Sequence, residues 1–239
     1  MISFARVAVG DGGFVGCTRC DPTAPARRYF SAQEIIGSVR SVADAWKDGP
    51  GPNVSLAGTE PFGHAELPAI IAGAVALGMQ RICLRTDGGA LSVDGNARGA
   101  VHAGVRQIEL VVLGDLAVHD ELAATPGLFV AARQGARAFL DAARDARVPA
   151  ALTAMLPVCR HNIAALPGAV ALLAEMGAVA VELDVAESAQ RAVGYRKWVS
   201  AALETGMVNG VWVYVRRADA PLASDARLHA VAPCGVWLG

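Results

Sequence analysis

Short apolar segments alternate with longer amphipathic segments along most of this 239-residue chain, and that alternation limits the possible folds more than any single motif. Apolar runs typical of strands cover residues 2–9, 53–58, 81–85, 107–113, 151–158, 179–185 and 211–216. Helical segments lie between them, over residues 31–47, 66–77, 95–104, 128–146, 163–176 and 189–205. Because parallel strands require crossover connections, this order predicts a parallel sheet with helices packed against it.

The number of strand–helix units narrows the prediction further. Six such units and one extra strand fit a partial (βα)6 TIM-like barrel better than a closed eight-fold barrel. The strands are continuous apolar runs, which is typical of strands covered on both faces. A chain of this length can form one large hydrophobic core. We therefore expect an α/β fold in which residues 1–217 form the barrel and residues 218–239 form a C-terminal tail.

Two local features refine the expected boundaries. Ser31 is followed three residues later by Glu34, a capping-box pattern that predicts the start of the first helix. The segment around His119 lies between the fourth strand and the helix over residues 128–146, and we expect it to be a long loop.

Composition excludes several classes of function. The formal net charge is −1, so no strong overall field attracts nucleic acid or a membrane surface. No apolar stretch reaches membrane-spanning length, and Arg6 interrupts the N-terminal apolar run, so no secretory signal is evident. The five cysteines are odd in number and mostly scattered, unlike a secreted disulfide framework. We expect a cytoplasmic protein.

The carboxyl ends of the expected strands carry an unusual number of polar and sulfur-containing side chains. Ligands of parallel α/β folds bind at that edge of the sheet. The residues concerned are Cys17, Cys20, Glu60, Thr86, Asp87, Asp115, His119, Cys159, His161, Asn162 and Glu187.

The loop after the first strand contains Cys17 and Cys20, in the segment Gly13-Phe14-Val15-Gly16-Cys17-Thr18-Arg19-Cys20. A structural zinc site would need further ligands, and no second CxxC or HxxxH partner is evident. A thioredoxin-like pair would open a helix within a different strand order. The segment instead resembles the CxxxCxxC signature of the radical S-adenosylmethionine (radical SAM) superfamily, with Gly13 in the place of the first cysteine.

Three more segments resemble this family in the same order. Gly58-Thr59-Glu60-Pro61 is similar to its GGEP element, and Thr86-Asp87-Gly88 to the TNG ending of its third strand. His119–Phe129 is similar to the segment before its fourth helix. Each match alone also fits an ordinary turn, but the unbroken order over residues 4–185 is more specific.

The resemblance implies a site and a cofactor. In this family the GGEP element receives the methionyl amino group of S-adenosylmethionine, which assigns cofactor binding to the residues Gly58, Thr59, Glu60, Pro61, Thr86 and Asp87. Three thiolates hold a [4Fe–4S] cluster, and an electron from the cluster cleaves S-adenosylmethionine to a radical that abstracts hydrogen from the substrate. Here Cys17 and Cys20 form an incomplete metal site, because Gly13 has no side chain to bind iron.

Three hypotheses follow. We favour a degenerate radical SAM fold that acts without radical chemistry, as a pseudoenzyme that binds a ligand or serves an intact radical SAM enzyme as partner. Its setting would be the modification of a peptide or another natural product, by analogy. The second hypothesis is an active enzyme with unconventional cluster ligation, in which Cys159, another residue or a partner protein supplies the third ligand, or an enzyme that uses S-adenosylmethionine without a cluster. The third is an unrelated α/β-barrel enzyme whose metal is bound by Glu60, Asp87 and Asp115.

Overall fold

Seven parallel strands follow one another across the sheet in the order of the chain, and a short antiparallel strand lies at one edge. The computed structural model describes residues 4–11, 28–46, 52–185, 187–217 and 229–230. The sheet order is β7-β6-β5-β4-β3-β2-β1-β8. The strands are β1 (Ala5–Ala8), β2 (Asn53–Ala57), β3 (Arg81–Thr86), β4 (Val105–Val111), β5 (Ala151–Val158), β6 (Ala178–Val185), β7 (Trp212–Arg217) and β8 (His229–Ala230).

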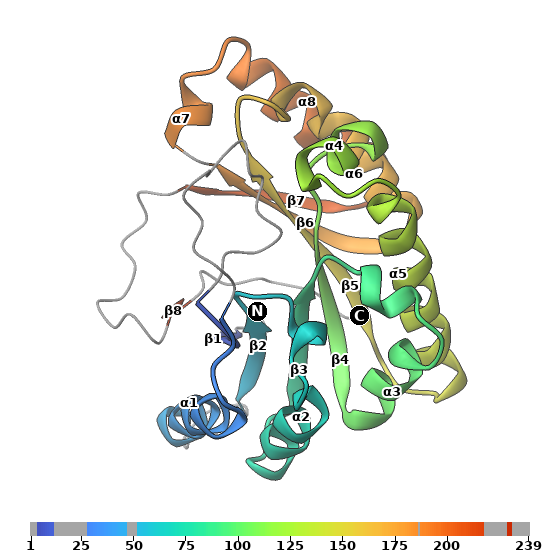
Figure 1. Ribbon diagram of the computed structural model, residues 1–239. Helices are drawn as coiled ribbons and strands as arrows, with labels where there is room; N and C mark the ends of the chain where they lie inside the picture. Colours follow the sequence, from blue (N-terminus) through green and yellow to red (C-terminus); the bar gives the residue numbers. More distant parts are fainter. Residues whose placement is uncertain (1–3, 12–27, 47–51, 186, 218–228, 231–239) are drawn as a thin grey trace.

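The helices connect these strands and cover one side of the sheet. The α-helices are α1 (Ala32–Ala45), α2 (Leu67–Ala76), α3 (Asn96–Ala103), α4 (Leu116–Ala123), α5 (Leu128–Asp145), α6 (Leu166–Glu175), α7 (Glu187–Gln190) and α8 (Tyr195–Val208). Short 3-10 helices are η1 (Pro61–Gly63), η2 (Gly89–Ser92) and η3 (Ile163–Ala165). Figure 1 shows the sheet curled into an open half-barrel with the helices on its outer side. The expected partial TIM-like barrel is therefore confirmed.

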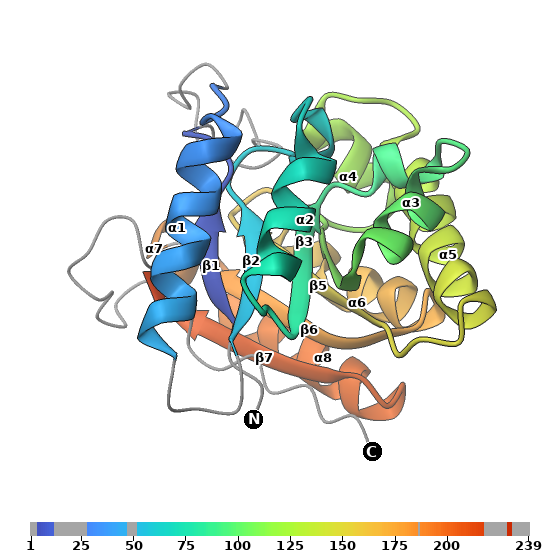
Figure 2. The same ribbon diagram turned by 90° about the horizontal axis from the view of Figure 1, so that it is seen from below.

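Helices that are neighbours around the half-barrel also contact each other. α1 packs beside α2, α3 beside α5, and α6 beside α8. Figure 2 shows α1 and α2 against the β1–β3 end of the sheet, α5 further along the helical layer beyond α3, and α8 beside β7. The chain thus has one outer helical layer and one curved sheet.

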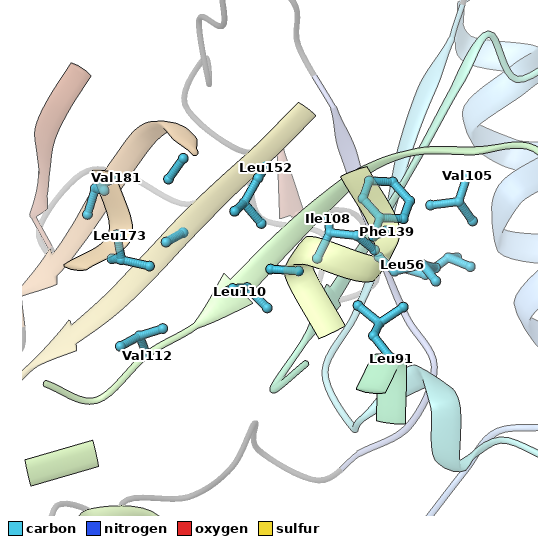
Figure 3. Close-up of a cluster of buried hydrophobic side chains, with 14 of the residues drawn as sticks. Leu56, Leu91, Val105, Ile108, Leu110, Val112, Phe139, Leu152, Leu173 and Val181 are labelled. Atoms are coloured by element: carbon cyan, nitrogen blue, oxygen red, sulfur yellow. The ribbon is translucent and has the colours of Figure 1, made fainter. Parts of the chain in front are cut away.

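The hydrophobic core lies between that sheet and its outer helices. Ile108 and Leu110 of β4 face Phe139 of α5, and all three side chains are fully buried (Figure 3). Leu173 of α6 and Val181 of β6 continue the same layer. Burying a Leu, Ile or Phe side chain contributes about 1.5–3 kcal/mol, so this layer is the main stabilising feature of the fold.

The capping box predicted for the first helix is present. Ser31 accepts a hydrogen bond from the backbone N–H of Glu34, and the carboxylate of Glu34 accepts one from the backbone N–H of Ser31. This reciprocal pair satisfies two donors that a helix start would otherwise leave unpaired. It explains why α1 begins at Ala32.

Two expected boundaries were wrong. The segment around His119 is the helix α4, because Asp115 accepts a hydrogen bond from the backbone N–H of Val118 and caps its start. The single helix expected over residues 189–205 is divided into α7 and α8. Gly194 lies between them with φ +79°, a left-handed conformation that interrupts helical geometry.

The strands are buried on both faces, as expected, but they are not apolar on both faces. Nearly all strand side chains from β2 to β6 are buried. However, the buried side chains that face away from the helices include Arg85 of β3, Glu109 of β4 and Glu182 of β6. The continuous apolar pattern was therefore an incomplete description of a sheet with one apolar face and one polar face. Among the residues that the structure describes, no helix has the length and hydrophobicity that crossing a membrane requires.

Candidate active site at the carboxyl ends of β2 and β3

The loop that follows β2 is held in a conformation that only glycine adopts easily. Gly58 has φ +94°, and a Cβ atom there would lie 2.9 Å from the carbonyl oxygen of Gly10. The close approach joins the ends of β1 and β2 at one edge of the sheet. The next residue, Thr59, is fully buried. The sequence motif therefore begins at a backbone position whose geometry excludes larger residues.

Glu60 is the central side chain of this loop. Its Oε1 accepts hydrogen bonds from the backbone N–H of Phe62 (3.1 Å) and from the hydroxyl of Thr86 (2.8 Å). Its Oε2 accepts one from the backbone N–H of Asp87 (2.8 Å). The carboxylate thus caps η1, which begins at Pro61, and ties the end of β2 to the end of β3. The structure brings together all six residues that the resemblance assigned to cofactor binding.

The electrostatic state of Glu60 is unusual. Burial and the nearby carboxylate of Asp87 raise its pKa to about 7, against the opposing effect of its three hydrogen bonds. Two carboxylates close together in a shielded position repel each other. A cation placed between or beside them would relieve this repulsion, so the arrangement is suited to bind a positively charged group.

Tyr29 and Phe30, which precede α1, contact the segment after β2. The hydroxyl of Tyr29 donates a hydrogen bond to the backbone carbonyl of Glu60 (2.9 Å). The Tyr29 ring meets the His64 ring edge-on, with centroids 5.3 Å apart. Nε2 of His64 lies 2.8 Å from the carbonyl oxygen of Phe30. The position of Glu60 is therefore fixed from two separate parts of the chain.

The turn after β3 has its own internal bonds. The backbone N–H of Gly88 donates to the hydroxyl of Thr86, and the N–H of Gly89 donates to the carboxylate of Asp87. Gly88 has φ +80°, and a Cβ there would lie 2.7 Å from Leu110. A Cβ at Gly135 of α5 would collide with the carbonyl oxygen of Gly88. The outer helix α5 therefore packs directly on the turn that carries Asp87.

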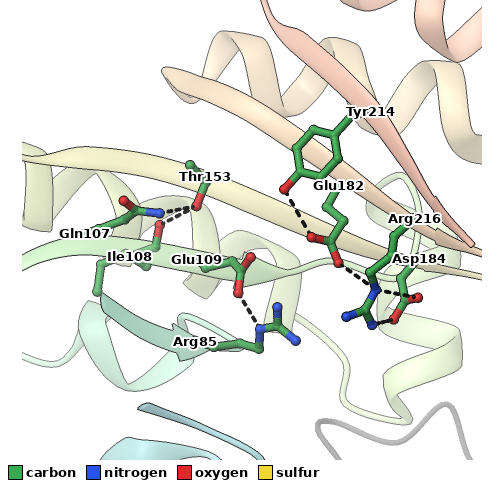
Figure 4. Close-up of polar contacts among 9 residues, drawn as sticks. All are labelled: Arg85, Gln107, Ile108, Glu109, Thr153, Glu182, Asp184, Tyr214 and Arg216. Atoms are coloured by element: carbon green, nitrogen blue, oxygen red, sulfur yellow. Dashed lines mark hydrogen bonds and ion pairs between the residues drawn. The ribbon is translucent and has the colours of Figure 1, made fainter. Parts of the chain in front are cut away.

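The inner face of the half-barrel carries a second group of polar side chains, which the sequence interpretation missed. Figure 4 shows these residues, drawn from β3, β4, β5, β6 and β7, converging inside the curve of the sheet. They are Arg85, Gln107, Glu109, Thr153, Glu182, Asp184, Tyr214 and Arg216. Arg6 of β1 and Ser55 of β2 lie opposite each other in register and belong to the same face. We call this set the inner polar layer.

Ion pairs organise the inner polar layer. Arg85 and Glu109 are paired Cα partners on β3 and β4, and their side chains form a buried ion pair. Arg216 makes two hydrogen bonds to Asp184 and an ion pair of 3.2 Å with Glu182. Burial raises the pKa of Glu109, but Arg85 outweighs it and holds that pKa below its usual value. Glu109 is therefore ionised inside the protein.

A pattern in the sequence would have identified this layer. Charged or polar residues recur at every second position of the strands, as in Glu182 and Asp184, Tyr214 and Arg216, and the polar Gln107 before Glu109. Alternation with period two places such residues on one face. Reading the strands only as apolar runs concealed this alternation.

Several of the remaining sequence candidates have structural roles or lie outside the described residues, and His161 is exposed. Cys17 and Cys20, proposed as metal ligands, and Gly13 are outside the described residues. Cys159 is buried beside Leu113 and Leu122 in a small apolar cluster. Over the described ranges, no group of three or more His, Cys, Asp or Glu side chains is arranged to hold a metal ion.

The metal set proposed for an unrelated barrel enzyme is therefore not assembled. Glu60 and Asp87 are neighbours, but the carboxylate of Asp115 caps α4. His119 is also a structural residue, because its Nδ1 accepts a hydrogen bond from the backbone N–H of Leu113 and its ring packs edge-on against Phe129. Burial lowers the pKa of His119 to about 4, so its ring is neutral.

Comparison with known proteins identifies the class of fold. No protein-family model matches the chain, and no curated protein matches it in sequence. Solved structures do match: SuiB of Streptococcus suis bound to S-adenosylmethionine superposes with a TM-score of 0.64 at 11% identity, over 92% of this chain and 52% of SuiB. SuiB bound to its precursor peptide SuiA gives a TM-score of 0.62 at 10% identity, over 92% of this chain and 50% of SuiB.

A third structure belongs to a different enzyme of the same class. Methylornithine synthase (PylB) superposes with a TM-score of 0.57 at 12% identity, over 88% of this chain and 64% of PylB. The chain has the partial-barrel fold of the radical SAM enzymes, as its sequence motifs led us to expect. It spans about half the length of SuiB.

Proposed function

We propose that this chain binds S-adenosylmethionine, or a close analogue, at the carboxyl ends of β2 and β3. We also propose that it acts without radical chemistry, as a binding or partner subunit in the modification of a peptide or another natural product. The observation that carries the binding proposal is the Glu60 carboxylate, buried beside Asp87 at the ligand-binding edge of a radical SAM-type barrel. The barrel would comprise residues 1–217, with residues 218–239 as a separate tail.

The residues present fit the cationic part of such a ligand. An amino acid ammonium carries a positive charge and up to three N–H donors, as does the ammonium of Lys. Oε1 of Glu60 already accepts two hydrogen bonds, whereas Oε2 accepts one from Asp87 and has a second lone pair. An ammonium group at Oε2 would also offset the repulsion between Glu60 and Asp87. When bound, S-adenosylmethionine would supply this ammonium and a sulfonium cation.

The non-radical part of the proposal depends on the sequence alone. Cys17 and Cys20 occupy two positions of the cluster motif. The third position is Gly13, which has no side-chain atom to bind iron. The peptide setting is suggested by SuiB, whose fold this chain shares and which has been crystallised with its precursor peptide. An intact radical SAM enzyme would then be the natural partner, because it would supply the complete cluster.

Calorimetric titration with S-adenosylmethionine tests the binding site. We expect the wild-type chain to bind it and Glu60→Gln to bind at least about tenfold more weakly, because the amide removes the negative charge that pairs with the ammonium. Glu204→Gln is the matched control, since Glu204 lies exposed on α8, and it should bind like the wild type. Equal affinities of the wild type and Glu60→Gln would disprove the assignment.

Anaerobic reconstitution with iron and sulfide tests the non-radical role. We expect sub-stoichiometric iron and no reductive cleavage of S-adenosylmethionine by the isolated chain. One [4Fe–4S] cluster per chain, with production of 5′-deoxyadenosine, would instead establish an active enzyme with unconventional ligation. Repeating the assay with Cys17→Ala and Cys20→Ala would show whether these thiols hold whatever iron is retained.

A further inference from the structure

The inner polar layer has three arginines and three carboxylates, but its ion pairs use only two of the arginines. Its three carboxylates are matched: Glu109 pairs with Arg85, and Glu182 and Asp184 both pair with Arg216. Arg6 on β1 is the third arginine of this face. No ion pair among the described residues includes Arg6, and its buried Nε has no hydrogen-bond partner there. The Nε–H of this arginine therefore lies on the inner face without an acceptor.

Four buried atoms of the layer make no hydrogen bond, three of them potential donors; the fourth, Oε1 of Glu182, has an ion pair of 3.2 Å with Arg216. Nε of Arg6, Nη2 of Arg85 and Oγ of Ser55 are shielded from solvent and make no hydrogen bond within the described part of the chain. Arg85 and Ser55 are 4% and 6% exposed, so solvent access does not compensate. Arg6 and Ser55 are register partners on β1 and β2. Two cationic donors and one hydroxyl thus lie on the same face without acceptors.

Such an arrangement is unfavourable for an unliganded protein. A buried donor without an acceptor destabilises the folded state, and does so more strongly when it is charged. Burial, and next the positive charge of Arg85, lower the pKa of Arg6. An apolar side chain at position 6 would avoid both effects. Buried polar groups without hydrogen-bond partners are expected mainly at functional sites.

We propose that Arg6, Ser55 and Arg85 form a subsite for a carboxylate group on the inner face of the half-barrel. This inference deepens the proposed function. Where it concerns the carboxylate of S-adenosylmethionine, it rests on the proposed function. Guanidinium groups bind planar carboxylates through paired N–H···O bonds, and the Ser55 hydroxyl can donate a further one. This subsite would bind an anion, whereas the Glu60–Asp87 pair is suited to bind a cation.

A carboxylate fits better than a phosphate. The three arginines and three carboxylates of the layer balance formally, so the layer tolerates one added negative charge better than two. Glu109 and Glu182 lie close enough to Arg6 to influence its charge, and they would repel a dianion more strongly than a monoanion. The carboxylate can belong to the methionyl part of S-adenosylmethionine or to a separate amino acid or peptide substrate.

A pair of small probes isolates the carboxylate. N-acetylglycine and N-acetylglycinamide have nearly the same shape, but only the first is an anion. At about 50 mM we expect N-acetylglycine to raise Tm by about 2 °C more than the amide does. The difference should persist in Arg40→Gln, which removes an exposed arginine of α1, and should vanish in Arg6→Gln. Equal shifts for the two probes, or an undiminished difference in Arg6→Gln, overturn the subsite.

Two further variants keep the test decisive if Arg6→Gln folds poorly. Ser55→Ala keeps every charge and should weaken N-acetylglycine binding about threefold to tenfold. Arg6→Met keeps the length of the side chain but removes the buried donor that has no acceptor, so its Tm without any probe should equal or exceed that of the wild type. A clear loss of stability in Arg6→Met, together with unchanged binding in Ser55→Ala, would count against the proposal.

Titration with S-adenosylmethionine distinguishes the source of the carboxylate. If Arg6→Gln weakens S-adenosylmethionine as Glu60→Gln does, the carboxylate is that of S-adenosylmethionine. If only the N-acetylglycine response is lost, the subsite belongs to a separate substrate. If the wild type does not bind S-adenosylmethionine but still responds to N-acetylglycine through Arg6, the proposed function fails while the subsite stands.

Discussion

The two faces of the same sheet follow different rules. The outer face packs Ile108 and Leu110 against Phe139 of α5 and contains only apolar contacts there. The inner face, one residue further along the same strand, holds Glu109 in an ion pair with Arg85. Both faces are buried, so burial does not distinguish them. The contrast shows that the outer face is built for stability, whereas the inner face is built to hold charges in place.

The largest effect is expected on the outer face. Phe139→Ala should lower the free energy of unfolding by about 3–5 kcal/mol, because it leaves a cavity between α5 and β4 that the rigid sheet cannot fill. Chemical denaturation of both proteins measures this. Phe139→Leu is the control and should lose much less. A loss below 1 kcal/mol for the alanine variant would contradict the view that this layer dominates stability.

Breaking one ion pair of the inner face should have a nearly comparable effect. Arg85→Met leaves Glu109 ionised and without its partner, which is expected to destabilise the fold by about 3–5 kcal/mol. The double variant Arg85→Met/Glu109→Leu removes both charges and should recover most of that loss in the same unfolding experiment. If the double variant is as unstable as the single one, the ion pair itself stabilises the sheet, and the contrast between the faces is weaker than we infer.

The raised pKa of Glu60 makes stability depend on pH. The folded-state pKa is about 7, above the ordinary value of 4.5, so the folded protein binds the extra proton between these values. The free energy of unfolding should therefore fall as pH rises from about 4.5 to 7, by up to about 3 kcal/mol. Glu60→Gln should flatten this slope. An unchanged slope in the variant would show that another group titrates.

Ionisation of Glu60 should lower stability but raise the affinity for S-adenosylmethionine. Glu60 gains its negative charge as pH rises through about 7, whereas an α-amino group loses its positive charge near pH 8. The affinity for S-adenosylmethionine should therefore rise between pH 6 and 7 and decline above about 8. Calorimetry across this range tests the profile, and in Glu60→Gln the rise below pH 7 should be absent.

The smallest effect is expected for a neutral pair of the inner face. Gln107 donates a hydrogen bond of 3.1 Å to the hydroxyl of Thr153. Thr153→Val removes the acceptor and should lower the free energy of unfolding by about 1 kcal/mol, because a buried donor loses its partner. The double variant Gln107→Leu/Thr153→Val should be nearly neutral. A larger loss in the double variant would indicate that this pair also positions Glu109.

The sequence predicted the order of strands and helices well, because each unit carries its own signal. The capping box at Ser31 and Glu34 and the glycines after the strands are local features that need no knowledge of distant contacts. The helix around His119 was missed, since its start depends on Asp115 capping a short segment. The division at Gly194 was missed because helical periodicity continues on both sides of it.

The candidate site was predictable only in part. The motifs located Glu60 and Asp87 at one edge of the sheet, but not that Thr86 and Asp87 donate hydrogen bonds to the Glu60 carboxylate. The inner polar layer depends on how the sheet curls, which brings β1 and β7 toward the same space. Residues as distant in sequence as Arg6 and Arg216 then influence each other.

The contact between Gly135 and Gly88 gives the outer helical layer an influence over the proposed ligand-binding edge. Gly135 lies in the middle of α5, far along the chain from Glu60, yet its missing side chain lets the helix lie directly on the turn that presents Asp87. A larger residue there would push that turn, and the carboxylate bonded to it, out of position from behind. The position of the Asp87 turn thus depends on the packing of α5, and it can change during evolution without any substitution among the residues of the proposed site.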